Sequence, residues 1–275
     1  MRISTKMTSV TFSTCWYNLK SKFPSDTYLK WADNMLSNVN CYNLVIYSDE
    51  ESCVPLKQYL SNPRIRIIIK PYHIFYNYRY KDYWIKNHEK NGLMKNTVDW
   101  KVNMLWSEKI HFVYQTITEQ YFDTEFYGWC DIGYFRGTPK DMSKSELIQW
   151  GSSSKIETLN RDKIYYALVN NDEVYINDAY NRINDKNELG LPRIPTPDFQ
   201  ISIGGGFFVS HKMNIEWWRN TFDEKLLLYF QHDYLVKDDQ HIILDCVFSN
   251  LTRFILCKED NKLYDNWFLF QRFLC

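Results

Sequence analysis

The sequence has no surplus of charge of either sign. Over 275 residues, 33 Lys and Arg residues balance 33 Asp and Glu residues, so the formal net charge at pH 7 is zero. A protein that binds nucleic acid usually carries a basic surplus, because it must neutralise phosphates. We therefore expect no nucleic-acid partner.

Long apolar runs and ordered cysteine motifs are also missing. No stretch approaches the roughly 18 apolar residues of a membrane span, and the polar segment Met1–Lys6 lacks the apolar core of a signal peptide. The cysteines form no C-x-x-C pair; they are Cys15, Cys41, Cys53, Cys130, Cys246, Cys257 and Cys275. This pattern disfavours a zinc ribbon or a disulfide scaffold. We expect free thiols, no integral membrane segment and a cytoplasmic location.

The signatures of three common enzyme classes are absent. The histidines form no H-E-x-x-H pair, which disfavours a zinc hydrolase. The sequence contains neither the G-x-S-x-G of α/β-hydrolases nor the G-x-x-x-x-G-K of P-loop enzymes.

Aromatic residues, in contrast, are plentiful. They make up 17% of the chain, with 21 Tyr and 10 Trp. Such side chains stack well on sugar rings and nucleotide bases. An AT-rich genome also tends to encode many Tyr residues, so two explanations of the aromatic content remain open.

The first third of the chain alternates between strand and helix patterns. Short β-branched and aromatic runs predict strands at Ser9–Thr14, Asn43–Tyr47 and Arg64–Ile69. Between the first two, apolar residues spaced by three and four predict an amphipathic helix over Ser25–Leu36. This order is typical of a parallel, doubly wound sheet.

The remainder continues the α/β pattern. Pro71–Asn96 is polar and aromatic without a clean period, which suggests a lid or a peripheral helix. The further predictions are helices at Trp100–Phe122, Asn214–His232 and Lys237–Phe248 and strands at Glu125–Cys130, Lys163–Val169, Ile201–Val209 and Arg253–Leu256. No repeat or low-complexity linker marks a boundary, so we expect one α/β domain over residues 1–275 with a mixed, mostly parallel sheet flanked by helices.

One carboxylate occupies a position suited to chemistry. Asp131 directly follows the strand Glu125–Cys130, and ligands of open α/β sheets bind at the carboxyl ends of the strands. Transfer from a nucleoside diphosphate requires neutralisation of the leaving diphosphate, which Mn²⁺ or Mg²⁺ on aspartate oxygens provides. Gly133 stands where a second aspartate often occurs. The alternative is that Asp131 is an ordinary turn or cap residue.

Two further motifs have both functional and structural explanations. Glycine weakens a strand, so Gly204, Gly205 and Gly206 indicate either close approach of a substrate sugar to the backbone or a bulge. Asp238, Asp239 and Gln240 open an apolar helix. They are either helix caps and dipole partners, or groups that grip sugar hydroxyls and accept an acceptor proton.

Taken together, these motifs resemble the HtrL/YibB-like proteins, which are regarded as glycosyltransferase relatives with a GT-A type fold. The matching segments are SVTFSTCWYN from Ser9, LVIYSD at 44–49, MLWSEKIHFV at Met104–Val113, GWCDIGYFR at Gly128–Arg136, GGGFFV at 204–209 and KDDQHIIL at 237–244. The likeness spans nearly the whole chain. The same order of motifs is similar to glycogenin-type enzymes.

The resemblance implies a role for each motif. Asp131 would be the metal ligand, the three glycines would face the donor sugar, and Asp239 and Gln240, with the adjacent Asp238, would form the catalytic group. The residues expected to hold the nucleoside and the phosphates are Ser13, Thr14, Asp49, Lys109 and Arg136. The sequence departs from the glycogenin-type pattern in its single aspartate and in lacking a late H-x-x-G-x-x-K motif, where only Asp265, Asn266 and Trp267 stand as candidate ligands.

The sequence therefore predicts a glycosyltransferase. It would move a sugar from a nucleotide-sugar, a UDP-sugar by the resemblance, to a glycan or protein acceptor. The alternative is a catalytically inactive glycan-binding or scaffold protein on the same fold. Binding of a nucleotide separates the two.

Overall fold

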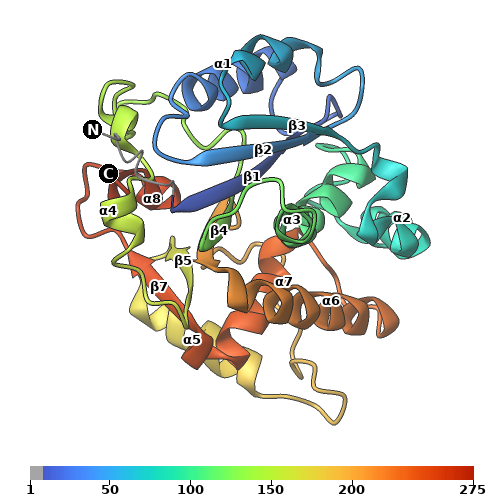
Figure 1. Ribbon diagram of the computed structural model, residues 1–275. Coiled ribbons are helices and arrows are strands. Elements are labelled where there is room, and N and C mark those ends of the chain that lie inside the picture. Colours follow the sequence, from blue (N-terminus) through green and yellow to red (C-terminus); the bar gives the residue numbers. More distant parts are fainter. Residues whose placement is uncertain (1–8) are drawn as a thin grey trace.

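Seven strands form one sheet within residues 9–275, the part of the chain that the computed structural model describes (Figure 1). The strand order is β3-β2-β1-β4-β6-β5-β7. The strands are β1 (Val10–Trp16), β2 (Asn43–Ser48), β3 (Ile65–Ile69), β4 (Phe126–Cys130), β5 (Ile164–Leu168), β6 (Phe207–His211) and β7 (Phe254–Lys258). Strand β6 runs antiparallel to both of its neighbours, and the other pairs are parallel. The expected mixed, mostly parallel sheet is confirmed.

Helices cover both faces of this sheet (Figure 1). They are α1 (Ser25–Leu36), α2 (Lys81–Lys90), α3 (Trp100–Thr118), α4 (Ser153–Ile156), α5 (Glu173–Asn184), α6 (Ile215–Gln231), α7 (Asp239–Ser249) and α8 (Leu269–Phe273). Side chains alternate along a strand, so Val45 and Tyr47 of β2 pack with α3 and α6, whereas Leu44 and Ile46 pack with α1. Two apolar cores result, one on each face.

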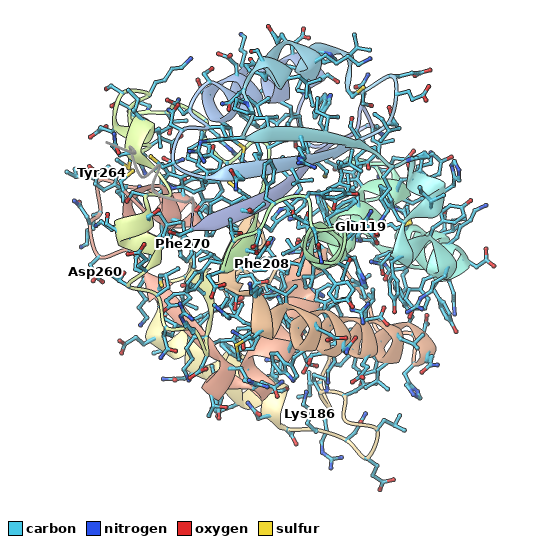
Figure 2. The ribbon with its side chains drawn as sticks, in the orientation of Figure 1. Glu119, Lys186, Phe208, Asp260, Tyr264 and Phe270 are labelled. Carbon is cyan, nitrogen blue, oxygen red and sulfur yellow. The ribbon has the colours of Figure 1, made fainter. Side chains whose placement is uncertain are left out.

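The two cores are filled largely by aromatic rings. Phe208 of β6 belongs to the core beneath α3, α6 and α7, and Phe270 of α8 belongs to the opposite core (Figure 2). The neighbouring residue Phe207 stacks on Phe270, with ring centroids 4.4 Å apart. Part of the aromatic content of the sequence therefore serves packing.

Several predicted boundaries differ from the structure. The predicted strand Ile201–Val209 is wrong in its first half, because β6 begins only at Phe207; the preceding glycines supply no side chains to pack. The predicted helix Trp100–Phe122 ends at Thr118, and Gln120 adopts a φ of +51° that stops it. Helix α5 was not predicted as a separate helix; Asp172 caps it by accepting from the backbone N–H groups of Val174 and Tyr175.

Two compositional expectations can be compared with the structure. All seven cysteines are free within residues 9–275. None of the helices described is both long and apolar enough to cross a membrane. The Met1–Lys6 segment lies outside the described residues.

Candidate active site

A cavity of about 390 Å³ opens at the carboxyl ends of β1 and β4. Both strands run in the same direction, so Trp16 and Asp131 lie at one edge of the sheet. Strand β6 runs the other way, so Gly206, the residue just before it, reaches the same edge. Helix α3 and the start of α7 complete the wall. This is the crevice where open α/β sheets bind ligands.

Lys109 of α3 lies at the centre of the polar wall, between Asp131 and Asp239. Its Nζ is 3.1 Å from Asp131 Oδ1 and 3.0 Å from Asp239 Oδ2, and it donates to the carbonyl of Gly205 at 2.8 Å. Burial lowers the pKa of Lys109, but the charges of Asp131 and Asp239 outweigh it and raise the pKa above its ordinary value. The ammonium therefore stays charged and links β4, α7 and the glycine segment.

Asp131 is held by the end of β4. Its backbone N–H donates to the carbonyl of Gly206 at 2.9 Å, and its Oδ1 accepts from Trp129 Nε1 at 2.6 Å. The side chain is 39% exposed, so the carboxylate is fixed on one side and faces the cavity on the other. This geometry is more typical of a residue that contacts a ligand than of a residue that only caps a turn.

The three residues at the start of α7 have different roles in the structure. Asp238 is the N-cap, accepting from the N–H of Gln240 at 3.2 Å, and it pairs with Lys237 at 3.3 Å. The buried Asp239 instead pairs with Lys109. Burial raises the pKa of Asp239 to about 6, opposed by Lys109. Gln240 Oε1 is buried without a hydrogen-bond partner, and all three residues line the cavity.

Close approach to the glycine segment comes from the two carboxylates. A Cβ on Gly205 would lie 2.8 Å from Asp239 Oδ2, and one on Gly206 would lie 3.2 Å from Asp131 Oδ2. Gly204 faces the apolar Val169 instead, where a Cβ would lie 3.1 Å from Cγ1. Gly205 and Gly206 thus allow the two acids to converge on Lys109.

Arg136 presents a second cation to the cavity. Its guanidinium lies over the rings of Trp31, Phe268 and Phe23 at 4.5, 4.9 and 5.4 Å from their centroids. Its Nε donates a long hydrogen bond of 3.4 Å to the carbonyl of Gly133. Within residues 9–275, no carboxylate lies within ion-pair distance of it.

Four predicted residues do not line the cavity: Ser13, Thr14, Asp49 and Gly204. Ser13 and Thr14 are buried within β1, and the hydroxyl of Ser13 pairs with that of Thr116 at 2.8 Å. Asp49 accepts from the N–H of Ser52 at 2.7 Å, in the turn after β2.

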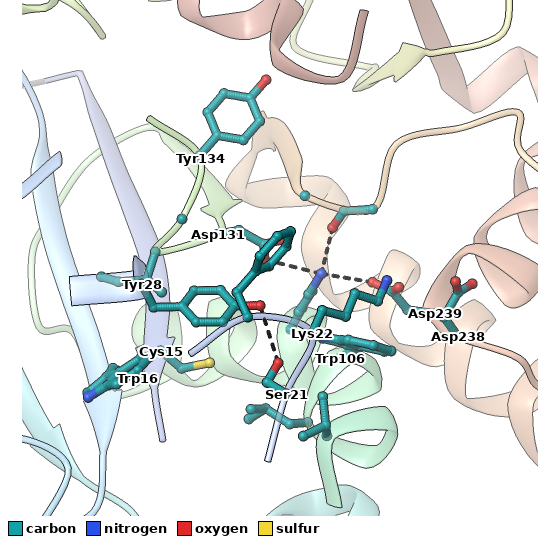
Figure 3. A pocket seen from close by; sticks show the side chains of 18 of the residues that line it. Cys15, Trp16, Ser21, Lys22, Tyr28, Trp106, Asp131, Tyr134, Asp238 and Asp239 are labelled. Carbon is teal, nitrogen blue, oxygen red and sulfur yellow. Dashed lines mark hydrogen bonds and ion pairs between the residues drawn. The ribbon is translucent and has the colours of Figure 1, made fainter. Parts of the chain in front are cut away.

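Sequence reasoning missed most of the aromatic wall and one cation. The cavity is lined by Trp16, Tyr17, Phe23, Tyr28, Trp106, Trp129, Trp267 and Phe268. The missed cation is Lys22, whose Nζ lies 4.7 Å from the Trp106 ring centroid (Figure 3). Lys22 stands in the polar loop before α1, where no periodic pattern or motif distinguishes it from other surface lysines.

The residues at Asp131 do not fit a divalent cation held by the protein. Within residues 9–275, no group of three or more His, Cys, Asp or Glu side chains could hold a metal ion. Gly133 has no side chain that could serve as a second ligand. Asp239, an acid across the site from Asp131, already shares the ammonium of Lys109 with it. Asp265 lines the cavity but caps a turn by accepting from the N–H of Trp267.

No protein-family model and no curated protein matches this sequence. Among solved structures, the chain is similar to mouse xyloside xylosyltransferase 1, with a TM-score of 0.47 and 12% identity over 90% of this chain and 85% of that chain. It is also similar to the galactosyltransferase LgtC in complex with donor and acceptor sugar analogues, with a TM-score of 0.44 and 11% identity over 86% and 69% of the two chains. An active-site variant of LgtC gives a TM-score of 0.44 and 11% identity over 86% and 70%. These neighbours are glycosyltransferases.

Proposed function

We propose that this chain is a glycosyltransferase, which moves a sugar from a nucleotide-sugar to a hydroxyl of a glycan or protein acceptor. The observation that carries the proposal is the convergence of Asp131 and Asp239 on Lys109 inside an aromatic-walled cavity. Such a cavity offers both charged groups and ring faces. A nucleotide-sugar has parts that match both, with hydroxyls and phosphates joined to a flat base.

The polar wall suits a sugar. Carboxylates accept hydrogen bonds from hydroxyls, and Asp131 and Asp239 lie on either side of one ammonium. The buried Oε1 of Gln240 has no partner in the protein, and a buried polar atom of this kind is costly unless a ligand or water satisfies it. A sugar hydroxyl supplies the missing donor.

One cavity cation named in the sequence analysis, Arg136, suits the leaving group. In the transfer, the bond between the anomeric carbon and the diphosphate oxygen breaks, and the electron pair leaves with the diphosphate. The acceptor oxygen forms the new bond to the anomeric carbon, and its proton passes to a cavity carboxylate. Arg136 stabilises the negative charge on the departing diphosphate by proximity, and Lys109 holds the two carboxylates in place.

The proposed donor is a UDP-sugar, as the resemblance to the HtrL/YibB-like proteins implies. The aromatic wall supports the binding of a flat base. It does not select uracil, because every base stacks on an aromatic ring. We assign no divalent metal to Asp131, because Lys109 already takes one oxygen of that carboxylate.

Calorimetric titration tests the proposal. UDP, GDP, ADP and their sugars are titrated into the protein, and into Asp239→Asn, which keeps the size of the side chain but loses its charge. We expect one nucleotide series to bind the wild type and its sugar-bearing member to bind the variant more weakly. Binding of glycans with no nucleotide bound by folded protein would instead support the inactive glycan-binding alternative.

A further inference from the structure

We infer that this site holds the diphosphate of its donor with Lys22 and Arg136 and needs no divalent metal ion, because Lys109 already fills the space between the two carboxylates. The inference rests on the proposed function for the identity of the ligand. It adds a binding residue, Lys22, and a mode of charge neutralisation.

Lys109 occupies the space between Asp131 and Asp239. The Nζ of Lys109 has two carboxylate oxygens and one carbonyl oxygen within 3.1 Å. Oxygens of these types are what a hard divalent cation would take as ligands. A metal ion placed between the same two carboxylates would meet a buried ammonium at close range, and like charges in a buried site repel strongly. Lys109 is therefore the resident cation.

Several charged side chains around the cavity are already paired with one another. Lys109 is committed to Asp131 and Asp239, and Asp238 pairs with Lys237. Among residues 9–275, neither Lys22 nor Arg136 has a carboxylate within ion-pair distance. These two are the lining cations left to bind an anion.

Aromatic rings hold the cationic ends of Lys22 and Arg136. Lys22 lies over the ring of Trp106, 4.7 Å from its centroid, and Figure 3 shows its ammonium on the side of the cavity where Asp239 lies. The guanidinium of Arg136 lies over Trp31 and Phe268. Ring faces attract and orient a cation without neutralising it. Both heads thus line the cavity without a direct ion pair to any described residue, and the ammonium of Lys22 feels Asp238 and Asp239 only from beyond ion-pair distance.

The test is the binding of UDP, GDP and ADP by calorimetry, in a chelator and again in excess Mn²⁺. We expect the nucleotide that binds to do so in the chelator, with an affinity that Mn²⁺ changes by less than about threefold. Lys22→Met and Arg136→Met should each weaken it about tenfold or more, because each loses a charge-assisted contact. The free nucleoside should bind all three proteins alike.

Lys30→Met is the matched control, because Lys30 is exposed on α1 and does not line the cavity. Far-ultraviolet circular dichroism and thermal unfolding establish that each variant is folded. Binding that requires Mn²⁺, or Lys22→Met with wild-type affinity, overturns the inference and leaves the proposed function standing. No binding of any nucleotide by folded wild type, with or without Mn²⁺, overturns both.

Discussion

The ammonium of Lys109 lies 3.0 Å from Asp239 Oδ2 and joins the middle of α3 to the first turn of α7. The same ammonium lies 3.1 Å from Asp131 Oδ1 at the end of β4. A single cation thus fixes the distance between two acids that belong to different parts of the chain. This bridge therefore matters both for the stability of the fold and for the binding of the ligand.

Removal of the bridging cation should destabilise the protein. In Lys109→Met, two carboxylates lose their shared partner, and breaking a buried ion pair typically costs about 3–5 kcal/mol. The partial exposure of Asp131 places the expected loss at the low end, about 3 kcal/mol at neutral pH. Urea unfolding measures it.

The matched control for this variant is Lys101→Met on the same helix. Lys101 pairs with Asp99 near the surface, and such pairs contribute about 0–1 kcal/mol. Asp239 becomes neutral more readily once Lys109 is gone, so the loss in Lys109→Met should shrink as the pH falls toward 5. An equal loss of stability in Lys109→Met and Lys101→Met would show that the ion pairs of Lys109 contribute no more than a surface pair.

A methyl group on Gly205 should disturb the site from the backbone side. In Gly205→Ala, the new Cβ would lie 2.8 Å from Asp239 Oδ2, so the carboxylate must move away from Lys109. We expect a loss of about 1–3 kcal/mol in stability and weaker nucleotide binding. Thermal unfolding and calorimetry give the two values.

Gly92→Ala separates this effect from the general cost of replacing glycine. A Cβ on Gly92 meets nothing within 4 Å. The unfolding temperature of Gly92→Ala should therefore stay at or above that of the wild type. If Gly205→Ala behaved in the same way and kept its affinity, the close approach of Asp239 would have no consequence.

Two buried histidines should make the protein less stable in acid. Burial lowers the pKa of His111 well below 6.5, and the nearby cations Arg219, Lys70 and Arg79 lower it further. Burial also lowers the pKa of His241. The unfolded chain takes up these protons below pH 6.5 while the folded chain does not, so stability falls as pH falls. His111 contributes up to about 1.4 kcal/mol per pH unit below 6.5, and His241 contributes only until the pH reaches its own lowered pKa.

His111→Phe tests this slope. The variant keeps a ring against Tyr76, on which His111 stacks with centroids 3.8 Å apart, but it cannot take a proton. Its free energy of unfolding should fall less steeply than that of the wild type between about pH 6.5 and 5.5. His232→Gln, at an exposed position, serves as the control. Parallel slopes for the wild type and His111→Phe would contradict the assignment.

Local patterns predicted the elements that carry the site. The helix at Ser25–Leu36 has the predicted bounds, and β4 ends one residue before Asp131 as expected. These features depend on neighbours in sequence, through apolar spacing and strand propensity. The strand Ile201–Val209 was misjudged because its apolar flanks outweighed three glycines that supply no packing.

The arrangement of the site could not be read from the sequence in the same way. Lys109 lies on a face of α3 that is set by tertiary packing, and its two acids come from β4 and α7. Lys22 comes from a loop without periodicity. The carboxyl ends of parallel strands are known to converge, but which distant side chains share one ammonium depends on the finished fold.

The most direct measurement is the release of nucleoside diphosphate from a mixture of UDP-, GDP- and ADP-sugars, followed by mass spectrometry with glycan and peptide acceptors present. We expect one donor to be consumed and its sugar to appear on an acceptor or in water. Asp239→Asn should be slower by about a hundredfold or more, because it loses a charged group that positions the sugar. If folded wild-type protein consumes no donor and binds glycans without nucleotide, the protein is not the glycosyltransferase proposed.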